Sequence, residues 1–458
     1  MNDGVVPGSF RDPSGHVFER DGVLYRQVNP SYADSYDQLI ESGLYKALTK
    51  RNLLIPHEEV EQSSTATTPA YRILKPTRIP FISYPYEWCF GQLKEAALAT
   101  LEIQKLSLEF GMSLKDSTAY NIQFVDNRAL LMDTLSFERL REGEPWVAYR
   151  QFCQHFLAPL ALSAYRDTRL SCLSQRYIDG VPLDLASQLL PARTYFRTSL
   201  LTHLHLHAKS QSHFQDKQVG SRRRKVSRIA LMGILDSLET GIRKLGLKQS
   251  KTTWSEYYDE TNYSRAAFEE KKRQVEQFIE LAKPADAWDL GANNGVFSRI
   301  AAAKQIPTVS FDFDPMAVEQ NYLTCKETKD SNLLPLVMDL ANPSPAIGWN
   351  NTERQSLLDR GPADLAMALA LVHHLAIANN VPLPALAQFF ASLCNWLIIE
   401  FVPKEDSQVQ RMLSTREDIF ADYTVEGFES EFARLFEIVK RQAVGDSSRT
   451  LYLMKKRP

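Results

Sequence analysis

The chain has 458 residues, of which 44% are hydrophobic and 24% charged, with a formal net charge of −2. This length predicts two or three domains, and the near-neutral charge disfavours a dedicated nucleic-acid binder, which would carry a basic excess. Five scattered cysteines without a CxxC pair indicate reduced thiols in a cytoplasmic protein. No secretory signal is visible, and no uncharged apolar run reaches the roughly 18 residues that a membrane span needs. The sequence sets no oligomeric state.

Three regions follow one another along the chain. Residues 1–190 alternate short strand-like and helical runs, which predicts an α+β domain. Residues 191–250 look like a helical connector and hold the basic tract SRRRKVSR at 221–228. Residues 251–458 repeat a strand-then-helix pattern, so we expect an α/β domain with a mostly parallel sheet.

The first region begins with an expected hairpin over residues 17–28, which turns at Asp21-Gly22. A helix is expected at about 35–50, followed by strand-like runs at 71–76 and 78–88. A long helix near 90–110 then precedes a strand pair around Asp126-Asn127.

Three polar residues flank the expected strand pair. Asp116 and Asn121 have the spacing D-x-x-x-x-N, and Asp133 follows the asparagine by twelve residues. This pattern resembles the catalytic loop and metal-binding aspartate of protein-kinase-like phosphotransferases. The resemblance implies that Asp116 positions an acceptor hydroxyl and that Asn121 and Asp133 hold magnesium.

The departures from that pattern predict a degenerate site. No glycine-rich phosphate loop is present, and no V-A-I-K lysine is evident; Arg26 is the nearest cation on a suitable strand. Thr134-Leu135 follows Asp133 in place of Phe-Gly. We therefore interpret 1–190 as a kinase-like domain with a vestigial phosphotransfer site that recognises the acceptor. The alternative is coincidence, because such residues are common in turns.

Two further patterns in the second region carry weaker signals. His203 and His207 are one helical turn apart, but no cysteine or acidic residue nearby completes a tetrahedral site, so no metal is expected. The basic tract is typical of a solvated connector, with contact to RNA as the alternative.

The third region divides into recognisable elements. A helix is expected over 264–281, where apolar residues recur at helical spacing. Strands are expected at 287–290, 308–314, 334–340, 363–372 and 395–402, with a closing antiparallel hairpin formed by 436–444 and 450–456.

Chemically suggestive residues stand at the ends of these strands, where ligands bind in an open parallel sheet. Asp289-Leu290-Gly291-Ala292-Asn293-Asn294-Gly295 follows the first strand, Asp312 the second and Asp339 the third. Together they resemble the cofactor site of class I S-adenosylmethionine-dependent methyltransferases. The resemblance covers about 251–458 and implies a Rossmann-like seven-stranded sheet.

The methyltransferase resemblance implies a role for each matching residue. The loop with Asp289, Gly291 and Gly295 would cradle the methionine and ribose parts of S-adenosylmethionine, Asp312 the ribose hydroxyls and Asp339 the adenine. Asn293 replaces the middle glycine of the family motif. The alternative is another nucleotide-binding Rossmann fold, but its G-x-G-x-x-G fingerprint is absent.

The methyl acceptor is less well defined. The fourth strand ends in Val372-His373-His374-Leu375 rather than the Asn/Asp-Pro-Pro-aromatic motif of many amino-group methyltransferases. His373 and His374 are candidate catalytic bases; the alternative is that they cap a helix or pack below the cofactor. Candidate substrate contacts are Glu400, Lys404, Tyr258 and Tyr263.

The sequence thus predicts an S-adenosylmethionine-dependent methyltransferase that acts on an O or C nucleophile of a small-molecule or saccharide-like acceptor. The layout resembles nodulation-type methyltransferases and proteins that fuse kinase-like and methyltransferase domains. The alternatives are a bifunctional kinase–methyltransferase, an RNA methyltransferase, and a non-catalytic cofactor-binding protein.

Overall fold

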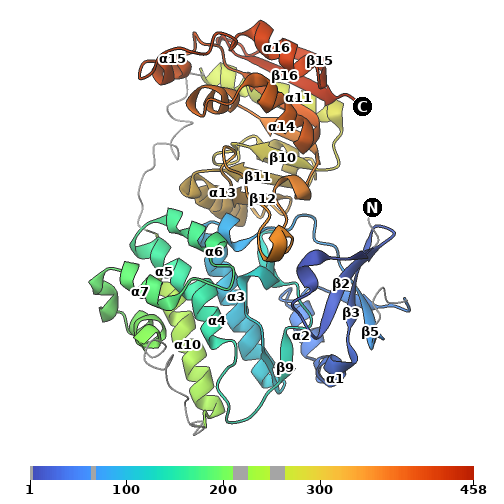
Figure 1. Cartoon of the computed structure of the whole chain (residues 1–458), viewed down its shortest axis with the longest axis vertical. Helices are drawn as coiled ribbons and strands as arrows, with labels where there is room; N and C mark the ends of the chain where they lie inside the picture. Colours follow the sequence, from blue (N-terminus) through green and yellow to red (C-terminus); the bar gives the residue numbers. More distant parts are fainter. Residues whose placement is uncertain (1–3, 63–68, 210–224, 248–263) are drawn as a thin grey trace. The chain divides into compact units, whose positions relative to one another are not determined.

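The computed structural model describes residues 4–62, 69–209, 225–247 and 264–458 (Figure 1). The chain forms two compact units. Unit 1 consists of Met1–Gln249 together with Gly348–Arg354, and unit 2 of Ser250–Ile347 and Gln355–Pro458. Of the separate connector expected at 191–250, residues 191–249 therefore lie in unit 1, as does a seven-residue segment from the sequence of the third region.

Unit 1 begins with a five-stranded sheet in the order β1-β2-β3-β5-β4, with all neighbours antiparallel. Its strands are β1 (Gly4–Val5), β2 (Gly15–Arg20), β3 (Val23–Val28), β4 (His57–Glu59) and β5 (Arg72–Pro76). The predicted hairpin is confirmed: Asp21 and Gly22 both have positive φ, at 51° and 74°, as a tight two-residue turn requires. The helix expected at 35–50 is divided at Gly43 (φ 86°) into α1 (Ala33–Glu41) and α2 (Leu44–Lys50).

The strand expected at 78–88 is wrong. The segment contains a short 3₁₀ turn, Pro85–Glu87, because two of its backbone N–H groups bond to side chains and two bond to carbonyls within the turn instead of a neighbouring strand. The Ser83 N–H donates to Gln123 Oε1 at 2.9 Å, and the Tyr84 N–H to Glu87 Oε2 at 3.0 Å.

A long buried helix forms the centre of the remainder of unit 1. This helix, α3 (Phe90–Glu109), agrees closely with the prediction. Two short antiparallel strand pairs follow it in the sequence: β6 (Met112–Leu114) with β9 (Phe137–Arg139), and β7 (Ile122–Val125) with β8 (Arg128–Leu131). The β7–β8 pair is the predicted one, and it turns at Asp126 and Asn127, which have φ of 51° and 55°.

Helices complete unit 1. They are α4 (Tyr149–Phe152), α5 (Ala158–Tyr165), α6 (Leu173–Arg176), α7 (Leu183–Leu189), α8 (Thr198–Leu200) and α10 (Arg228–Lys244). Helix α10 packs on α3, where Lys105 contacts Asp236 and Glu239 at 2.5 Å each. His203, for which no metal was expected, bonds to the hydroxyls of Tyr149 and Ser237.

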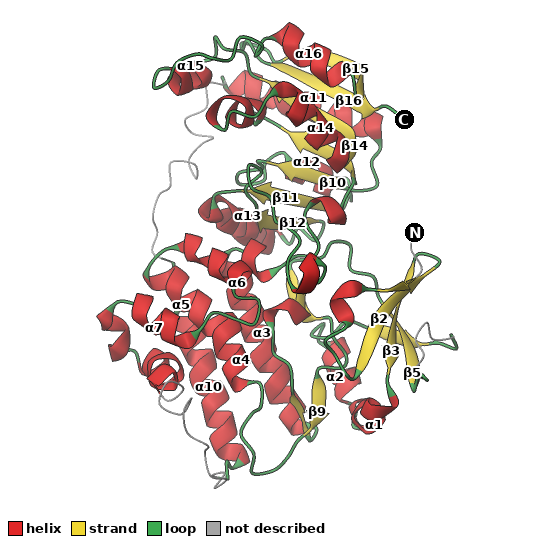
Figure 2. Cartoon of the chain, in the orientation of Figure 1, coloured by secondary structure: helices red, strands yellow, loops and turns green. Residues whose placement is uncertain are grey.

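Unit 2 is built on one seven-stranded sheet (Figure 2). The strand order is β12-β11-β10-β13-β14-β16-β15; the first five are parallel, and β16 is antiparallel to both of its neighbours. The strands are β10 (Ala287–Leu290), β11 (Thr308–Asp312), β12 (Leu333–Val337), β13 (Ala363–Ala368), β14 (Cys394–Phe401), β15 (Phe436–Ala443) and β16 (Thr450–Lys456). The predicted seven-stranded α/β sheet with a closing antiparallel hairpin is confirmed.

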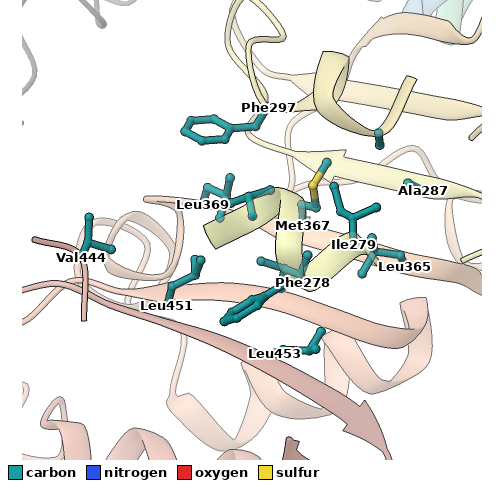
Figure 3. Close-up of a cluster of buried hydrophobic side chains, with 13 residues drawn as sticks. Phe278, Ile279, Ala287, Phe297, Leu365, Met367, Leu369, Val444, Leu451 and Leu453 are labelled. Carbon is teal, nitrogen blue, oxygen red and sulfur yellow. The ribbon is translucent and has the colours of Figure 1, made fainter. Parts of the chain in front are cut away.

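Helices flank this sheet and bury its apolar faces. They are α11 (Arg265–Ala282), α12 (Ser298–Ala303), α13 (Pro315–Thr328), α14 (Leu383–Leu393), α15 (Ser407–Leu413) and α16 (Val425–Ala433). Phe278 and Ile279 of α11 lie in a core cluster with Leu365, Met367 and Leu453 of the sheet (Figure 3). Among the described residues, no helix has the length and apolar character needed to cross a membrane.

Candidate functional site

The loop after β10 adopts a backbone that favours glycine. Gly291 and Gly295 both have a φ of 78°, in the left-handed region. A Cβ on Gly295 would lie 2.4 Å from Asn321 Oδ1, and that amide is itself held by Arg299 and Ser310. A side chain at position 295 would therefore displace an anchored group.

Asn293 takes the place of the middle glycine without breaking the loop. Its φ is 51°, a left-handed value that asparagine tolerates better than most residues. Its side-chain oxygen accepts the Asn294 N–H at 2.8 Å, and its own N–H donates to Asp312 Oδ2 at 2.7 Å. The departure from the family motif is therefore compatible with the loop conformation.

Asp312 ends β11 and joins this loop to the neighbouring strand. Oδ2 accepts the Asn293 N–H, and Oδ1 accepts the Asp314 N–H at 2.9 Å. The side chain is buried, and this burial raises the pKa of the carboxyl to about 6. Each carboxylate oxygen keeps capacity for a further hydrogen bond, so Asp312 can receive a pair of ligand hydroxyls.

Asp289 lies on β10, one strand away. Its Oδ2 accepts the Ser298 hydroxyl at 2.5 Å, and burial raises its pKa to about 7. Asp289 and Asp312 are thus two buried carboxyls close to their titration points at neutral pH. Asp339, two residues beyond the end of β12, is exposed and accepts the Ala341 N–H at 2.9 Å. The three predicted aspartates stand at the carboxyl ends of three adjacent strands.

The two histidines follow β13. His373 is fully buried, and neither of its ring nitrogens has a hydrogen-bond partner within the described chain. The His374 ring lies 4.2 Å from it, centroid to centroid. Burial lowers the pKa of both rings, that of His374 to about 4. Both imidazoles are therefore neutral at physiological pH and only weakly basic.

Glu400 does not have the exposed position expected for a substrate contact. It is fully buried at the end of β14, and its Oε2 accepts Lys271 Nζ at 2.6 Å and the Ala370 N–H at 2.7 Å. Ala370 has a φ of 50°, strained for a residue other than glycine, so Glu400 holds the turn that precedes the histidines. The expectation for Glu400 is corrected accordingly: it is a structural anchor.

The other candidate substrate contacts have different outcomes. Lys404 Nζ pairs with Asp418 at 2.8 Å on the surface. Tyr258 and Tyr263 lie outside the described residues, as do residues 221–224 of the basic tract.

Lys271 was missed by reasoning from the sequence. It is buried in α11 beneath the Ala370 turn, with Nζ 4.8 Å from the centre of the Phe297 ring. A signal was present, because Lys271 lies on the apolar stripe of this helix, three residues after Phe268 and four before Val275. A lysine on such a stripe indicates a buried partner of opposite charge.

Unit 1 brings its three predicted residues together. The Ser136 hydroxyl links two of them, since it donates to Asp133 Oδ2 at 2.6 Å and accepts from Asn121 Nδ2 at 3.2 Å. Asp116 accepts the Thr118 N–H and the Gln151 amide, and burial raises the pKa of its carboxyl.

The described residues of unit 2 thus form an α/β domain in which the predicted glycine loop and aspartates follow one edge of a mostly parallel sheet. The chain is 36% identical over 461 residues to nodulation protein NoeA of Rhizobium meliloti (strain 1021), covering 99% of this chain and 96% of the relative. The chain belongs to the NoeA family. No family model matches it.

Solved structures with a similar fold include several methyltransferases. Magnesium protoporphyrin IX methyltransferase ChlM from Synechocystis PCC 6803, with bound SAH, is 14% identical, with a TM-score of 0.33, and covers 44% of this chain and 93% of its own. N-methyltransferase NodS from Bradyrhizobium japonicum WM9 is 13% identical, with a TM-score of 0.30, and covers 43% of this chain and 99% of its own. The bifunctional kinase-methyltransferase WbdD is 16% identical, with a TM-score of 0.30, and covers 44% of this chain and 41% of its own. At these scores the similarities carry no argument about the reaction.

Proposed function

We propose that unit 2 is an S-adenosylmethionine-dependent methyltransferase that methylates an O or C nucleophile of a small-molecule or saccharide-like acceptor. The observation that carries the proposal is Asp312. This buried carboxylate, held by two backbone N–H groups at a strand end, lies against a glycine loop with left-handed backbone. Such an arrangement suits a ligand that offers two neighbouring hydroxyls beside a compact chain, as the ribose and methionine of this cofactor do.

The other strand ends have complementary roles in this proposal. The left-handed backbone at Gly291, Asn293 and Gly295 shapes the loop that would hold the cofactor, and Asp289 precedes this loop on β10. Asp339 is exposed, so its second carboxylate oxygen is accessible to an adenine amino group. The cofactor itself supplies an electrophilic methyl group on a sulfonium.

The histidines define the proposed acceptor side. A neutral imidazole accepts a proton from a hydroxyl or an acidic carbon as that group attacks the methyl. A pKa of about 4 for His374 makes it a weak base at pH 7, so alignment and desolvation supply most of the rate enhancement. We assign His373 and His374 to orienting the nucleophile and accepting its proton.

Binding of the cofactor gives the first test. We expect calorimetry to detect one S-adenosylhomocysteine site per chain, and Asp312→Asn to weaken it about 100-fold, because hydrogen bonds to a charged group contribute about 1.5–3 kcal/mol each. Asp359→Asn is the matched control, since that exposed aspartate bonds only to Ser356 among its side-chain contacts in the described chain. Equal affinity of the wild type and Asp312→Asn would contradict the proposal.

Catalysis needs a separate experiment, because a non-catalytic cofactor-binding protein would also pass the first. The full chain is incubated with methyl-labelled S-adenosylmethionine and fractionated cell extracts. Label in a saccharide or small-molecule fraction, lost in the His373→Ala/His374→Ala variant with S-adenosylhomocysteine binding retained, supports the proposal. Label in RNA would favour the alternative acceptor. Binding without transfer to any fraction would favour a cofactor sensor.

A further inference from the structure

The acidic residues of unit 1 surround an internal cation. Arg26 on β3 places Nη2 2.7 Å from Asp133 Oδ1 and 2.5 Å from Asp12 Oδ2. All three side chains are largely shielded from solvent, at 15%, 13% and 26% exposure. A guanidinium between two such carboxylates is a strong, oriented ion pair.

Both carboxylate oxygens of Asp133 are engaged, and Oδ1 already receives a cation. Oδ1 receives Arg26 and the Leu135 N–H at 3.1 Å, and Oδ2 receives the Ser136 hydroxyl. The second residue of the expected magnesium site, Asn121, turns its amide nitrogen toward Ser136. Magnesium requires oxygen ligands in near-ideal octahedral geometry. Within the described residues, no group of three or more His, Cys, Asp or Glu side chains is placed to hold a metal.

The segment before β2 is equally unsuited to phosphates. In kinase-like enzymes the loop before this position covers the phosphates with backbone N–H groups. Here the corresponding stretch contributes the carboxylate of Asp12, whose Oδ1 accepts the Ser14 N–H at 2.9 Å. Asp12 also neutralises Arg26, the cation on the strand where such enzymes carry a phosphate-binding lysine. The charge of Arg26 is therefore already compensated and attracts a nucleoside triphosphate only weakly.

We propose that Arg26 is a resident cation that takes the place of a divalent metal in unit 1. The guanidinium satisfies Asp133 and Asp12 permanently, so the unit folds without metal and does not bind a magnesium nucleotide or transfer its phosphoryl group. Arg26 and Asp133 then form an ion-pair centre between β3 and the β8–β9 connection. The proposal is independent of the methyltransferase activity of unit 2.

The test is titration of the full chain with Mn²⁺, with and without ATP, read by electron paramagnetic resonance. We expect no site-bound Mn²⁺ in the wild type. In Arg26→Met the freed carboxylates should bind at least ten times as much Mn²⁺ as the wild type at the same metal concentration, and Arg26→Met/Asp133→Asn should lose the gain. Arg20→Met, at the end of the adjacent strand β2, is the matched control because it removes a cation that contacts Gln62 rather than an acidic side chain of this centre.

Two outcomes would overturn the proposal. One is a wild-type site for Mn²⁺ or Mn²⁺–ATP that disappears in Asp133→Asn. The other is a folded Arg26→Met chain, checked by circular dichroism, that binds Mn²⁺ no better than Arg20→Met. If Arg26→Met does not fold, Arg26→Gln, which keeps a hydrogen-bond donor for Asp133, replaces it. The wild-type titration decides the absence of a metal site in either case.

Discussion

Asp312 of unit 2 and Asp133 of unit 1 are held in opposite ways. In unit 2, Asp312 is held by two backbone N–H groups, and Asp289 by a hydroxyl. In unit 1, Asp133 is held by the guanidinium of Arg26. Neutral donors orient a carboxylate without compensating its negative charge, which can still attract a ligand. A guanidinium neutralises that charge. The first arrangement is suited to a binding site and the second to a structural centre.

The largest change in stability is expected when the buried Lys271–Glu400 ion pair of unit 2 is broken. This pair resembles the Arg26 centre of unit 1, because a cation compensates a carboxylate in both. Lys271→Met leaves the Glu400 charge buried without its partner, so we expect a loss of about 3–5 kcal/mol in the free energy of unfolding. Urea denaturation measures this. Lys271→Met/Glu400→Gln should recover most of the loss, because glutamine still accepts the Ala370 N–H.

Lys272→Met is the control for that pair of variants, since this neighbouring lysine contacts only Glu269 and the Phe268 ring in the contacts described. A loss below 1 kcal/mol in Lys271→Met would show that water reaches Glu400 and that the pair is not structural.

The second-largest change in stability is expected when Asp289 is replaced. Burial raises the pKa of this carboxyl from 3.8 to about 7, so the folded state binds the proton more tightly than the unfolded state. The resulting stabilisation is complete below pH 4 and is lost as the pH rises through 7. Asp289→Asn should therefore stabilise ligand-free unit 2 by about 2–4 kcal/mol at pH 8, and by less than half of that at pH 5.

Urea denaturation at the two pH values checks this expectation. An Asp289→Asn chain that is less stable than the wild type at pH 8 would indicate that the carboxylate has a favourable ionic partner. Asp289 of unit 2 would then be held by a charge, as Asp133 of unit 1 is, and the contrast between these carboxylates would not hold.

A smaller effect is expected in the pH dependence of cofactor binding. The pKa of about 6 at Asp312 means that protonation competes with the ligand below that pH. Affinity for S-adenosylhomocysteine should fall about tenfold between pH 7.5 and pH 5, equivalent to about 1.4 kcal/mol. In Asp312→Asn the remaining affinity should vary much less over this range; an unchanged pH profile would assign the titration to another group.

The smallest effect is expected at Asp12. Asp12→Asn leaves Arg26 paired with Asp133, and Asp12 is the more exposed of the two carboxylates. We expect a loss below about 1 kcal/mol in the stability of unit 1, as for other partly exposed pairs. Thermal unfolding measures it. A loss as large as that in Asp133→Asn would mean that the two carboxylates contribute equally.

Local signals in the sequence were sufficient for much of unit 2 and part of unit 1. Strand-length apolar runs followed by glycine or aspartate predicted β10 and β11 within two residues, and Asp21-Gly22 predicted the β2–β3 turn. In each case the determining interaction lies within a few residues of chain. The same holds for the glycine loop, because the glycines themselves indicate a left-handed backbone.

Distant partners explain what the sequence did not reveal. Glu400 was expected in a cleft because its partner Lys271 is 129 residues away. The strand expected at 78–88 fails because Gln123, 40 residues later, takes the N–H of Ser83. Arg26 was visible as a cation on a suitable strand, but its contact with Asp133 became clear only from the fold.

The segment Gly348–Arg354 has a consequence for how the protein is made. Within unit 1 its Glu353 receives the Arg11 guanidinium at 2.7 Å, and the Arg354 guanidinium lies 4.5 Å from the centre of the Tyr120 ring. These contacts require residues synthesised about 100 positions after Gln249. At roughly 5–20 residues per second, a ribosome needs on the order of 5–20 s to supply them. Unit 1 therefore lacks these contacts while three of the five parallel strands of unit 2 are synthesised.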